Sequence, residues 1–163
     1  KAAQNLINLK PDYLSIHLSG GLNMVKDVVS VKSNTKILGI SMLTSLDNSD
    51  LKSFGYNCTN LSYVENLAKI GEKAGIDGLV SSANEIPHLK KHLNNSKMLF
   101  VTPGIRLCES EVNDQKRINS PGQAINNGSQ MLIIGRSITQ SGNPINSIKR
   151  ILQDIEKYYE DKN

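Results

Sequence analysis

Five short apolar runs, spread over the whole chain, constrain its fold more than any other feature of the sequence. They cover residues 13–17, 36–43, 77–81, 98–102 and 131–135. Within each run the apolar residues are nearly continuous rather than alternating with polar ones, which is typical of parallel strands covered on both faces. The sequence therefore predicts five parallel β-strands.

Helical patterns lie before, between and after these runs. Apolar residues in 6–9 and 22–29 indicate the first two helices, and residues 60–74 carry an i, i+3, i+4 stripe that ends at a glycine. Ser120 and Asn143 each precede a proline, as an N-cap precedes the first helical position, and the helix after Ser120 should close at a glycine near residue 128. The resulting alternation of helix and strand predicts an α/β domain with a parallel sheet.

Such a sheet is either closed into a barrel or open and doubly wound, and two features favour the barrel. Polar and glycine residues gather directly after the strands, where barrel active sites are built. In addition, the polar stretch 103–119 is long for a connection between strand and helix. A connection of that length could close over a ligand as a lid.

Each of the last two predicted strands is followed or ended by a glycine, and an arginine comes one or two positions after that glycine. These pairs are Gly104 with Arg106 and Gly135 with Arg136, and Arg117 lies between them. Glycine lets the backbone approach a ligand closely, and the guanidinium group offers a planar fork of donors that matches a phosphate. The two strand ends therefore predict an anion site, with a phosphate ester as the expected ligand.

Composition narrows the class of protein. The 163 residues fit one domain, 1–163, and the net charge of +4 comes mainly from scattered lysines. With two Phe, five Tyr and no Trp, a stacking platform for nucleic acid is not expected. No apolar run is long enough to span a membrane, and the first residues lack a signal-peptide pattern. Cys58 and Cys108 lack metal-ligand spacing, which favours free thiols and a cytoplasmic location.

The chain has three histidines, which are candidate ligands or catalysts. His17 ends a strand without a partner for nucleophilic or metal chemistry, so a structural role is expected. His88 and His92 are four residues apart and would share one helix face, a spacing that zinc sites use. No Asp, Glu or Cys ligand pattern lies nearby, so no metal site is predicted, and residues 90–92 are expected to form a solvated helix face.

Six segments, in order and spacing, resemble the orotidine 5'-phosphate decarboxylase family in its bacterial form. They are IHLSGG (16–21), MLTS (42–45), GLVSSANE (78–85), VTPGIR (101–106), DQKR (114–117) and IGRSIT (134–139). The resemblance implies a (β/α)8 TIM barrel, of which this chain would hold about the last five strands. It also implies conversion of orotidine 5'-phosphate to uridine 5'-phosphate (UMP) in pyrimidine biosynthesis, without a metal or organic cofactor, by a homodimer.

The same resemblance implies a role for five residues. Gly135 and Arg136 would hold the substrate phosphate, and Gln115 would bridge the phosphate and the pyrimidine. Thr44 would contact the pyrimidine, and Arg106 would join the substrate-binding shell. These roles agree with the anion site that the strand ends predict.

The chain departs from the family pattern in its catalytic residues. The family relies on an Asp-x-Lys-x-x-Asp motif and on a further Asp and Lys from earlier strands, and the 163 residues contain no such motif. We therefore expect a C-terminal piece without catalytic residues, inactive alone, whose edge strands 13–17 and 131–135 pair with a missing N-terminal segment or another copy. One alternative is a non-catalytic phosphate-binding remnant. The other is a sugar-phosphate lyase or epimerase of the same superfamily, and segments 42–45 and 114–117 argue against this second alternative.

Overall fold

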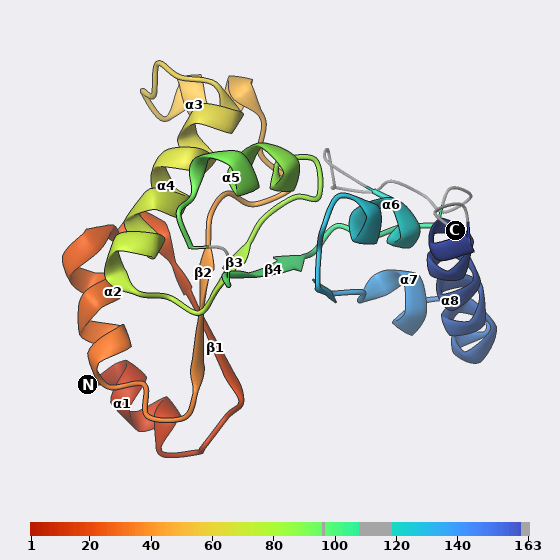
Figure 1. Cartoon of the computed structure of the whole chain (residues 1–163), viewed down its shortest axis with the longest axis horizontal. Helices are drawn as coiled ribbons and strands as arrows, with labels where there is room; N and C mark the ends of the chain where they lie inside the picture. The colour runs from red at the N-terminus through yellow and green to blue at the C-terminus, as the bar shows by residue number, and fades with distance from the viewer. Residues whose placement is uncertain (96, 108–118, 161–163) are drawn as a thin grey trace.

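A single parallel β-sheet organises the chain. The computed structural model describes residues 1–95, 97–107 and 119–160. Its strands lie side by side in chain order and all run in the same direction, so the predicted α/β class and parallel sheet are confirmed (Figure 1). The strands are β1 (Tyr13–His17), β2 (Lys36–Ile40), β3 (Gly78–Val80), β4 (Leu99–Thr102) and β5 (Met131–Leu132).

Helices connect the strands and follow the last one. Helices α1 to α5 lie around β1 to β4, whereas α6, α7 and α8 gather beside the end of β4 (Figure 1). The helices are α1 (Ala2–Ile7), the 3-10 turn η1 (Leu18–Gly20), α2 (Gly21–Ser30), α3 (Asn48–Ser53), α4 (Asn60–Ala74), α5 (Ile86–His92), α6 (Pro121–Asn126), α7 (Arg136–Thr139) and α8 (Pro144–Glu160). Within the described residues, none combines the length and apolar character that crossing a membrane requires.

Local capping chemistry fixes the ends of the predicted helices. The Thr59 hydroxyl accepts a hydrogen bond from the Ser62 N–H at the start of α4, and Gly75 ends that helix at φ +84°. Ser120 caps α6 in the same way, by accepting from the Gln123 N–H. At the start of α8, the Asn143 side chain accepts from the Asn146 N–H. All three helix starts lie where the sequence predicted them.

The central strands are buried on both faces. On one face the core is built from strand and helix side chains, including Ile37, Leu79 and Phe100. On the other face, Leu38, Val80 and Val101 form a separate apolar cluster. Strands β2 to β4 therefore match the prediction of near-continuous apolar strands, because both faces exclude water.

Strand β1 departs from that prediction. Its residues alternate between exposed and half-buried, and Tyr13, Ser15 and His17 are the exposed ones. The strand pairs on one side only, with β2, and the face that carries these three side chains has no cover among the described residues. Within the described residues both predicted edge strands are confirmed as edges, since β5 ends the sheet on the other side.

Four of the five predicted strands are shorter in the structure than in the sequence analysis, and β2 and β5 differ most. β2 stops at Ile40, which pairs with the last residue of β3, Val80. β5 stops at Leu132, which pairs with the last residue of β4, Thr102. Each strand thus ends where its neighbour ends, and Gly135, predicted to lie within the last strand, instead precedes α7.

Close contact between α6 and α8 gives a stability prediction. A Cβ at Gly122 would overlap the Tyr158 ring and the Asp154 carbonyl oxygen, and the Gly122 N–H donates to the Asp154 carboxylate at 2.8 Å. A backbone oxygen cannot move aside easily, so Gly122→Ala should lower the free energy of unfolding by about 1–3 kcal/mol. Urea unfolding of the parent and the variant measures this change in the free energy of unfolding. Gly142→Ala is the control, since its Cβ would meet no atom within 4 Å. Equal midpoints for the two variants would contradict the prediction.

Candidate anion-binding site

The predicted site residues that the structure describes all follow the carboxyl ends of strands. Thr44 follows β2, Arg106 follows β4, and Gly135 and Arg136 follow β5. Since the strands are parallel, these ends lie on the same side of the sheet. Thr44 follows a strand two positions from β4 and three positions from β5 in the sheet, so it approaches this edge from nearer the β1 side than the arginines do.

One backbone oxygen joins the two arginine-bearing loops. The Ile105 carbonyl accepts a hydrogen bond from Arg106 Nη1 at 2.8 Å and from Ser137 Oγ at 3.2 Å. Ser137 comes directly after Arg136 in the first turn of α7. The loop after β4 and the helix after β5 are therefore held together at the place where the sequence analysis predicted an anion site.

Arg106 is fixed by backbone contacts on both sides of its loop. Its N–H donates to the Asn119 carbonyl at 3.0 Å, and the Asn119 N–H donates to the Gly104 carbonyl at 3.4 Å. Ile105 and Asn119 thereby form an isolated parallel bridge. Only 7% of Arg106 is exposed, so its guanidinium group is held in a defined position rather than extended into solvent. A buried, fixed cation favours an anion brought close to it.

Gly135 and Arg136 form the turn into α7. The Gly135 carbonyl accepts from the N–H groups of Ile138 and Thr139, at 2.8 and 3.1 Å, which starts the helix. A Cβ placed on Gly135 would meet no atom within 4 Å, so the space beside this backbone is open. Arg136 is half-buried. The open glycine lets a ligand reach the backbone next to the arginine.

Thr44 lies in a tight turn, where the Leu46 N–H donates to the Leu43 carbonyl at 3.0 Å. The residue is 6% exposed. Strand β2 ends at Ile40, short of the predicted end at residue 43, and three residues, 41–43, separate it from Thr44. Thr44 therefore belongs to a loop at the carboxyl edge rather than to a strand end itself.

The predicted lid residues, Gln115 with its neighbours Asp114 and Arg117, lie outside the described residues, as does Cys108. The expected role of Gln115 therefore remains a prediction from the sequence. His17, for which a structural role was expected, ends the edge strand β1 with an exposed side chain.

A group of buried polar atoms at the same sheet edge was missed by the sequence analysis. These atoms are buried and have no hydrogen-bond partner among the described residues: Ser81 Oγ, Ser82 Oγ, Thr102 Oγ1 and Asn119 Oδ1. Thr102 ends β4, and the two serines follow β3. Buried hydroxyls are rarely left unpaired in folded proteins. Their gathering at this edge indicates that polar groups of a ligand or of water belong there.

The sequence analysis also missed a cluster on the outer helices. Glu65 of α4 lies beside His88 of α5, and the Glu65 carboxylate contacts His88 Nε2 at 2.6 Å. Hydrogen bonds from Lys69 and then His88 lower the pKa of Glu65 to about 2, so the carboxylate is ionised at neutral pH. Glu65 is 23 positions before His88, so no ligand spacing in the sequence marks the group.

Comparison with known proteins gives a consistent result. Residues 1–151 match the model of the orotidine 5'-phosphate decarboxylase / HUMPS family. An orotidine 5'-phosphate decarboxylase of Aquifex aeolicus is 37% identical over 153 residues, which are 93% of this chain and 66% of that protein. One from Coxiella burnetii is 42% identical over 149 residues, which are 88% and 63% respectively. The chain thus spans about two thirds of the length of these relatives.

Solved structures agree with the sequence comparison. The crystal structure of orotidine 5'-phosphate decarboxylase from Lactobacillus acidophilus aligns with a TM-score of 0.76 and 26% identity, covering 94% of this chain and 67% of that one. The enzyme from Pyrococcus horikoshii aligns with a TM-score of 0.67 at 18% identity, which supports the fold alone. The structure of this chain accordingly corresponds to part of a barrel.

Proposed function

Because this chain belongs to the orotidine 5'-phosphate decarboxylase family, we propose that it forms the substrate-binding part of an enzyme that converts orotidine 5'-phosphate to UMP and carbon dioxide. The observation that carries this proposal is the shared Ile105 carbonyl, which holds Arg106 and the start of α7 together. The loops that carry Arg106 and Arg136 are thereby joined at one edge of the sheet.

The phosphate of the nucleotide is bound at Arg106, Gly135 and Arg136. A guanidinium group donates two parallel hydrogen bonds to phosphate oxygens, and charge-assisted bonds of this kind are among the strongest in proteins. Arg106 is already oriented by its loop, so little side-chain freedom is lost on binding. Gly135 leaves room for the phosphate to approach the backbone.

The pyrimidine lies toward the middle of the sheet edge. Thr44 contacts it from the loop after β2, and Gln115 bridges it to the phosphate. Between these two ends lie the hydroxyls of Ser81, directly after β3, and Thr102, the last residue of β4. Neither has a hydrogen-bond partner within the described residues, and both are suited to hydrogen-bond the base or the sugar. The ligand thus extends along the carboxyl edge, from β2 to β5.

Binding of the phosphate contributes to a reaction that occurs elsewhere on the substrate. In decarboxylation the bond from the ring carbon to the carboxylate breaks, its electron pair stays on the carbon, and a proton then replaces the lost carbon dioxide. Interactions with a remote phosphate supply binding energy that positions the reacting end and favours the transition state. Arg106 and Arg136 act in this way, without touching the reacting carbon.

The acids and the proton-donating lysine come from another segment. The family motif Asp-x-Lys-x-x-Asp does not occur in these 163 residues. Strands β1 and β5 each have one unpaired edge within the described part of the chain, and a strand edge readily pairs with further strands. The motif-bearing segment completes the barrel there, and the complete enzyme is a homodimer.

A comparison of UMP with uridine tests the proposed binding site. The two differ only in the phosphate, so the chain should bind UMP at least about tenfold more tightly, because each charge-assisted hydrogen bond contributes about 1.5–3 kcal/mol. Two-dimensional NMR titration of the 163-residue chain measures both affinities and shows which residues respond. The amides of residues 104–106 and 135–137 should shift with UMP. Equal affinity for the two ligands would refute the proposal.

A non-catalytic phosphate-binding protein is the second candidate, and the missing motif is the observation that favours it. Such a protein would give the same titration. Turnover separates the two functions, because only the decarboxylase acquires activity when a motif-bearing segment is supplied.

A further inference from the structure

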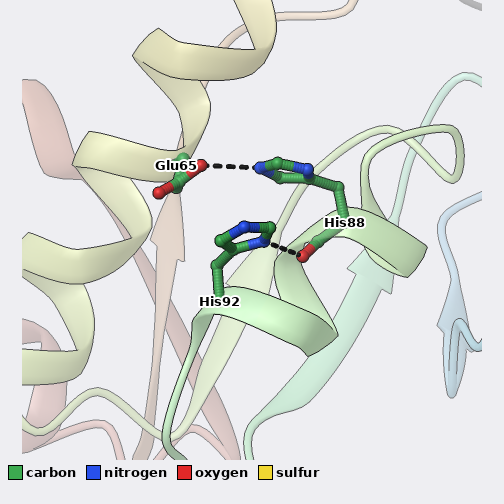
Figure 2. A group of neighbouring side chains, drawn as sticks. All are labelled: Glu65, His88 and His92. Atoms are coloured by element: carbon green, nitrogen blue, oxygen red, sulfur yellow. Dashed lines mark hydrogen bonds and ion pairs between the residues drawn. The ribbon is translucent and has the colours of Figure 1, made fainter.

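Two histidines and a glutamate form a compact group on the outer helices, away from the strand ends. His88 and His92 are one turn apart on α5, and their rings stack with centroids 4.0 Å apart at an interplanar angle of 23°. The Glu65 carboxylate reaches them from the neighbouring helix α4, as Figure 2 shows. One nitrogen or oxygen atom from each residue lies within 4.8 Å of the other two.

We propose that Glu65, His88 and His92 bind a divalent transition-metal ion of the zinc class. The donor set is two imidazole nitrogens and one carboxylate oxygen, which zinc accepts in a tetrahedral site, with water as the fourth ligand. Calcium and magnesium prefer oxygen ligands alone, so the two histidines select against them. The i, i+4 spacing places both imidazoles on one helix face, as in known zinc-binding helices.

The His92 ring is already oriented as a ligand. Its Nδ1 lies 2.8 Å from the His88 carbonyl oxygen (Figure 2). A carbonyl only accepts hydrogen bonds, so Nδ1 carries the hydrogen and Nε2 keeps its lone pair for a metal. Metal-binding histidines usually donate their second ring N–H to such an acceptor, which fixes tautomer and orientation. This bond therefore supplies the supporting contact that a built metal site needs.

Small changes complete the coordination. Ligand atoms at about 2.0–2.1 Å from a tetrahedral ion are roughly 3.3 Å apart, so the 2.6 Å contact of Glu65 with His88 must open slightly. His88 Nε2 must give up its hydrogen before it can bind the ion. The neutral His88 ring then carries its hydrogen on Nδ1 instead. The His88 and Glu65 side chains are 30% and 18% exposed, and His92 is exposed, so solvent and an ion reach the group.

Lys69 opposes the ion. Its ammonium group pairs with the second Glu65 oxygen, Oε1, one helical turn further along α4. The lysine side chain is half exposed, so it can turn into solvent when the ion binds. Removing its charge should therefore strengthen metal binding, up to about fivefold, as expected for an exposed ion pair.

A bound ion would link two helices that contribute to the main core. α4 places Val64 and Leu67 there, and α5 places Ile86 and Leu89 there. A ligand that binds only the folded state raises its stability in proportion to the logarithm of its concentration. The ion is thus expected to stabilise this half of the sheet, and the site uses none of the residues proposed for phosphate binding.

Titration of the 163-residue chain with zinc chloride tests the site. Calorimetry should give one ion per chain, and NMR should show the ring protons of His88 and His92 shifting together. His92→Gln should weaken binding at least about tenfold, and the exposed position of residue 92 means that the fold is retained. His17→Gln is the matched control, because His17 is the one histidine of the chain outside the group. This variant should bind zinc as the parent does.

Two further variants exclude other sites. Lys69→Gln should bind zinc more tightly than the parent, which no site away from α4 and α5 would do. Cys58→Ser, which removes a free thiol, should leave the affinity unchanged. The proposal is overturned if His92→Gln binds as the parent does, if Cys58→Ser abolishes binding, or if millimolar zinc shifts neither histidine.

Discussion

Replacing Arg136 with methionine is expected to weaken UMP binding by about 10- to 150-fold. The side chain is half-buried in the first turn of α7, and its neighbour Ser137 holds that turn against the Arg106 loop. Methionine keeps a long apolar stem but removes the guanidinium group, so the phosphate loses charge-assisted hydrogen bonds of about 1.5–3 kcal/mol. NMR or calorimetric titration with UMP gives the ratio of the two dissociation constants.

Two variants make this result specific. Arg136→Lys keeps the charge without the planar fork, so its affinity should lie between those of the parent and Arg136→Met. Arg150→Met makes the same change at an exposed position on α8 and should bind UMP as the parent does. Uridine, which lacks the phosphate, should bind all four proteins equally. If Arg136→Met kept the parent affinity for UMP, the phosphate would have to lie elsewhere.

The second large effect concerns catalysis: the 163-residue chain is expected to show no decarboxylation of orotidine 5'-phosphate. We propose that groups of this chain bind the nucleotide, but the chain contains no Asp-x-Lys-x-x-Asp motif from which a proton could be delivered to the carbanion-like carbon. Proton transfer requires an acid within about 3 Å of the reacting atom. Chromatographic separation of substrate and product over several hours measures this, with a full-length relative as positive control.

Adding a segment that carries the motif should both close the barrel and give decarboxylation of orotidine 5'-phosphate. We expect an N-terminal segment of a relative, carrying the motif and the first strands of the barrel, to pair with the open edges of β1 and β5. Co-purification should give one larger species on size-exclusion chromatography, with measurable decarboxylation that Arg136→Met reduces. Turnover by the chain alone would contradict the first expectation, and a stable mixture without activity would favour the non-catalytic function.

Local signals in the sequence explain which parts of the fold could be predicted. The bounds of α4, Asn60–Ala74, agree with prediction, because the Thr59 cap and the left-handed Gly75 depend only on neighbouring residues. Helix α3 was not predicted, although the Asp47 side chain and the Asp50 side chain form a reciprocal capping box at its start. That helix has six residues, too few for an apolar period to emerge.

Strand lengths depended on neighbours that the sequence does not reveal. The apolar run from residue 36 predicted a strand to residue 43, but β2 stops at Ile40 where β3 stops. An apolar run reports burial, whereas a strand also needs a partner to pair with. For the same reason, the exposed residues of β1 were predicted as buried, since the missing cover on one face is not visible in five residues of sequence.

In the candidate sites, too, some features follow from the local sequence and others only from tertiary packing. The loops that carry Arg106 and Arg136 could be predicted to lie on one side of the sheet, because parallel strands place their following loops there, and the two loops are joined through the Ile105 carbonyl. Glu65 could not be assigned to His88 and His92, since only the packing of α4 on α5 brings residues 23 positions apart together. Contacts between helices depend on tertiary structure rather than on spacing.

The chain-order arrangement of the sheet has a consequence for biosynthesis. Every strand pairs with the one made immediately before it, so a chain leaving the ribosome can add each strand–helix unit to a template that is already present. We expect the α1–β4 part to become compact while later codons are still being translated. Helices α6, α7 and α8 join last, so the proposed phosphate site at Arg136 forms only at the end of synthesis.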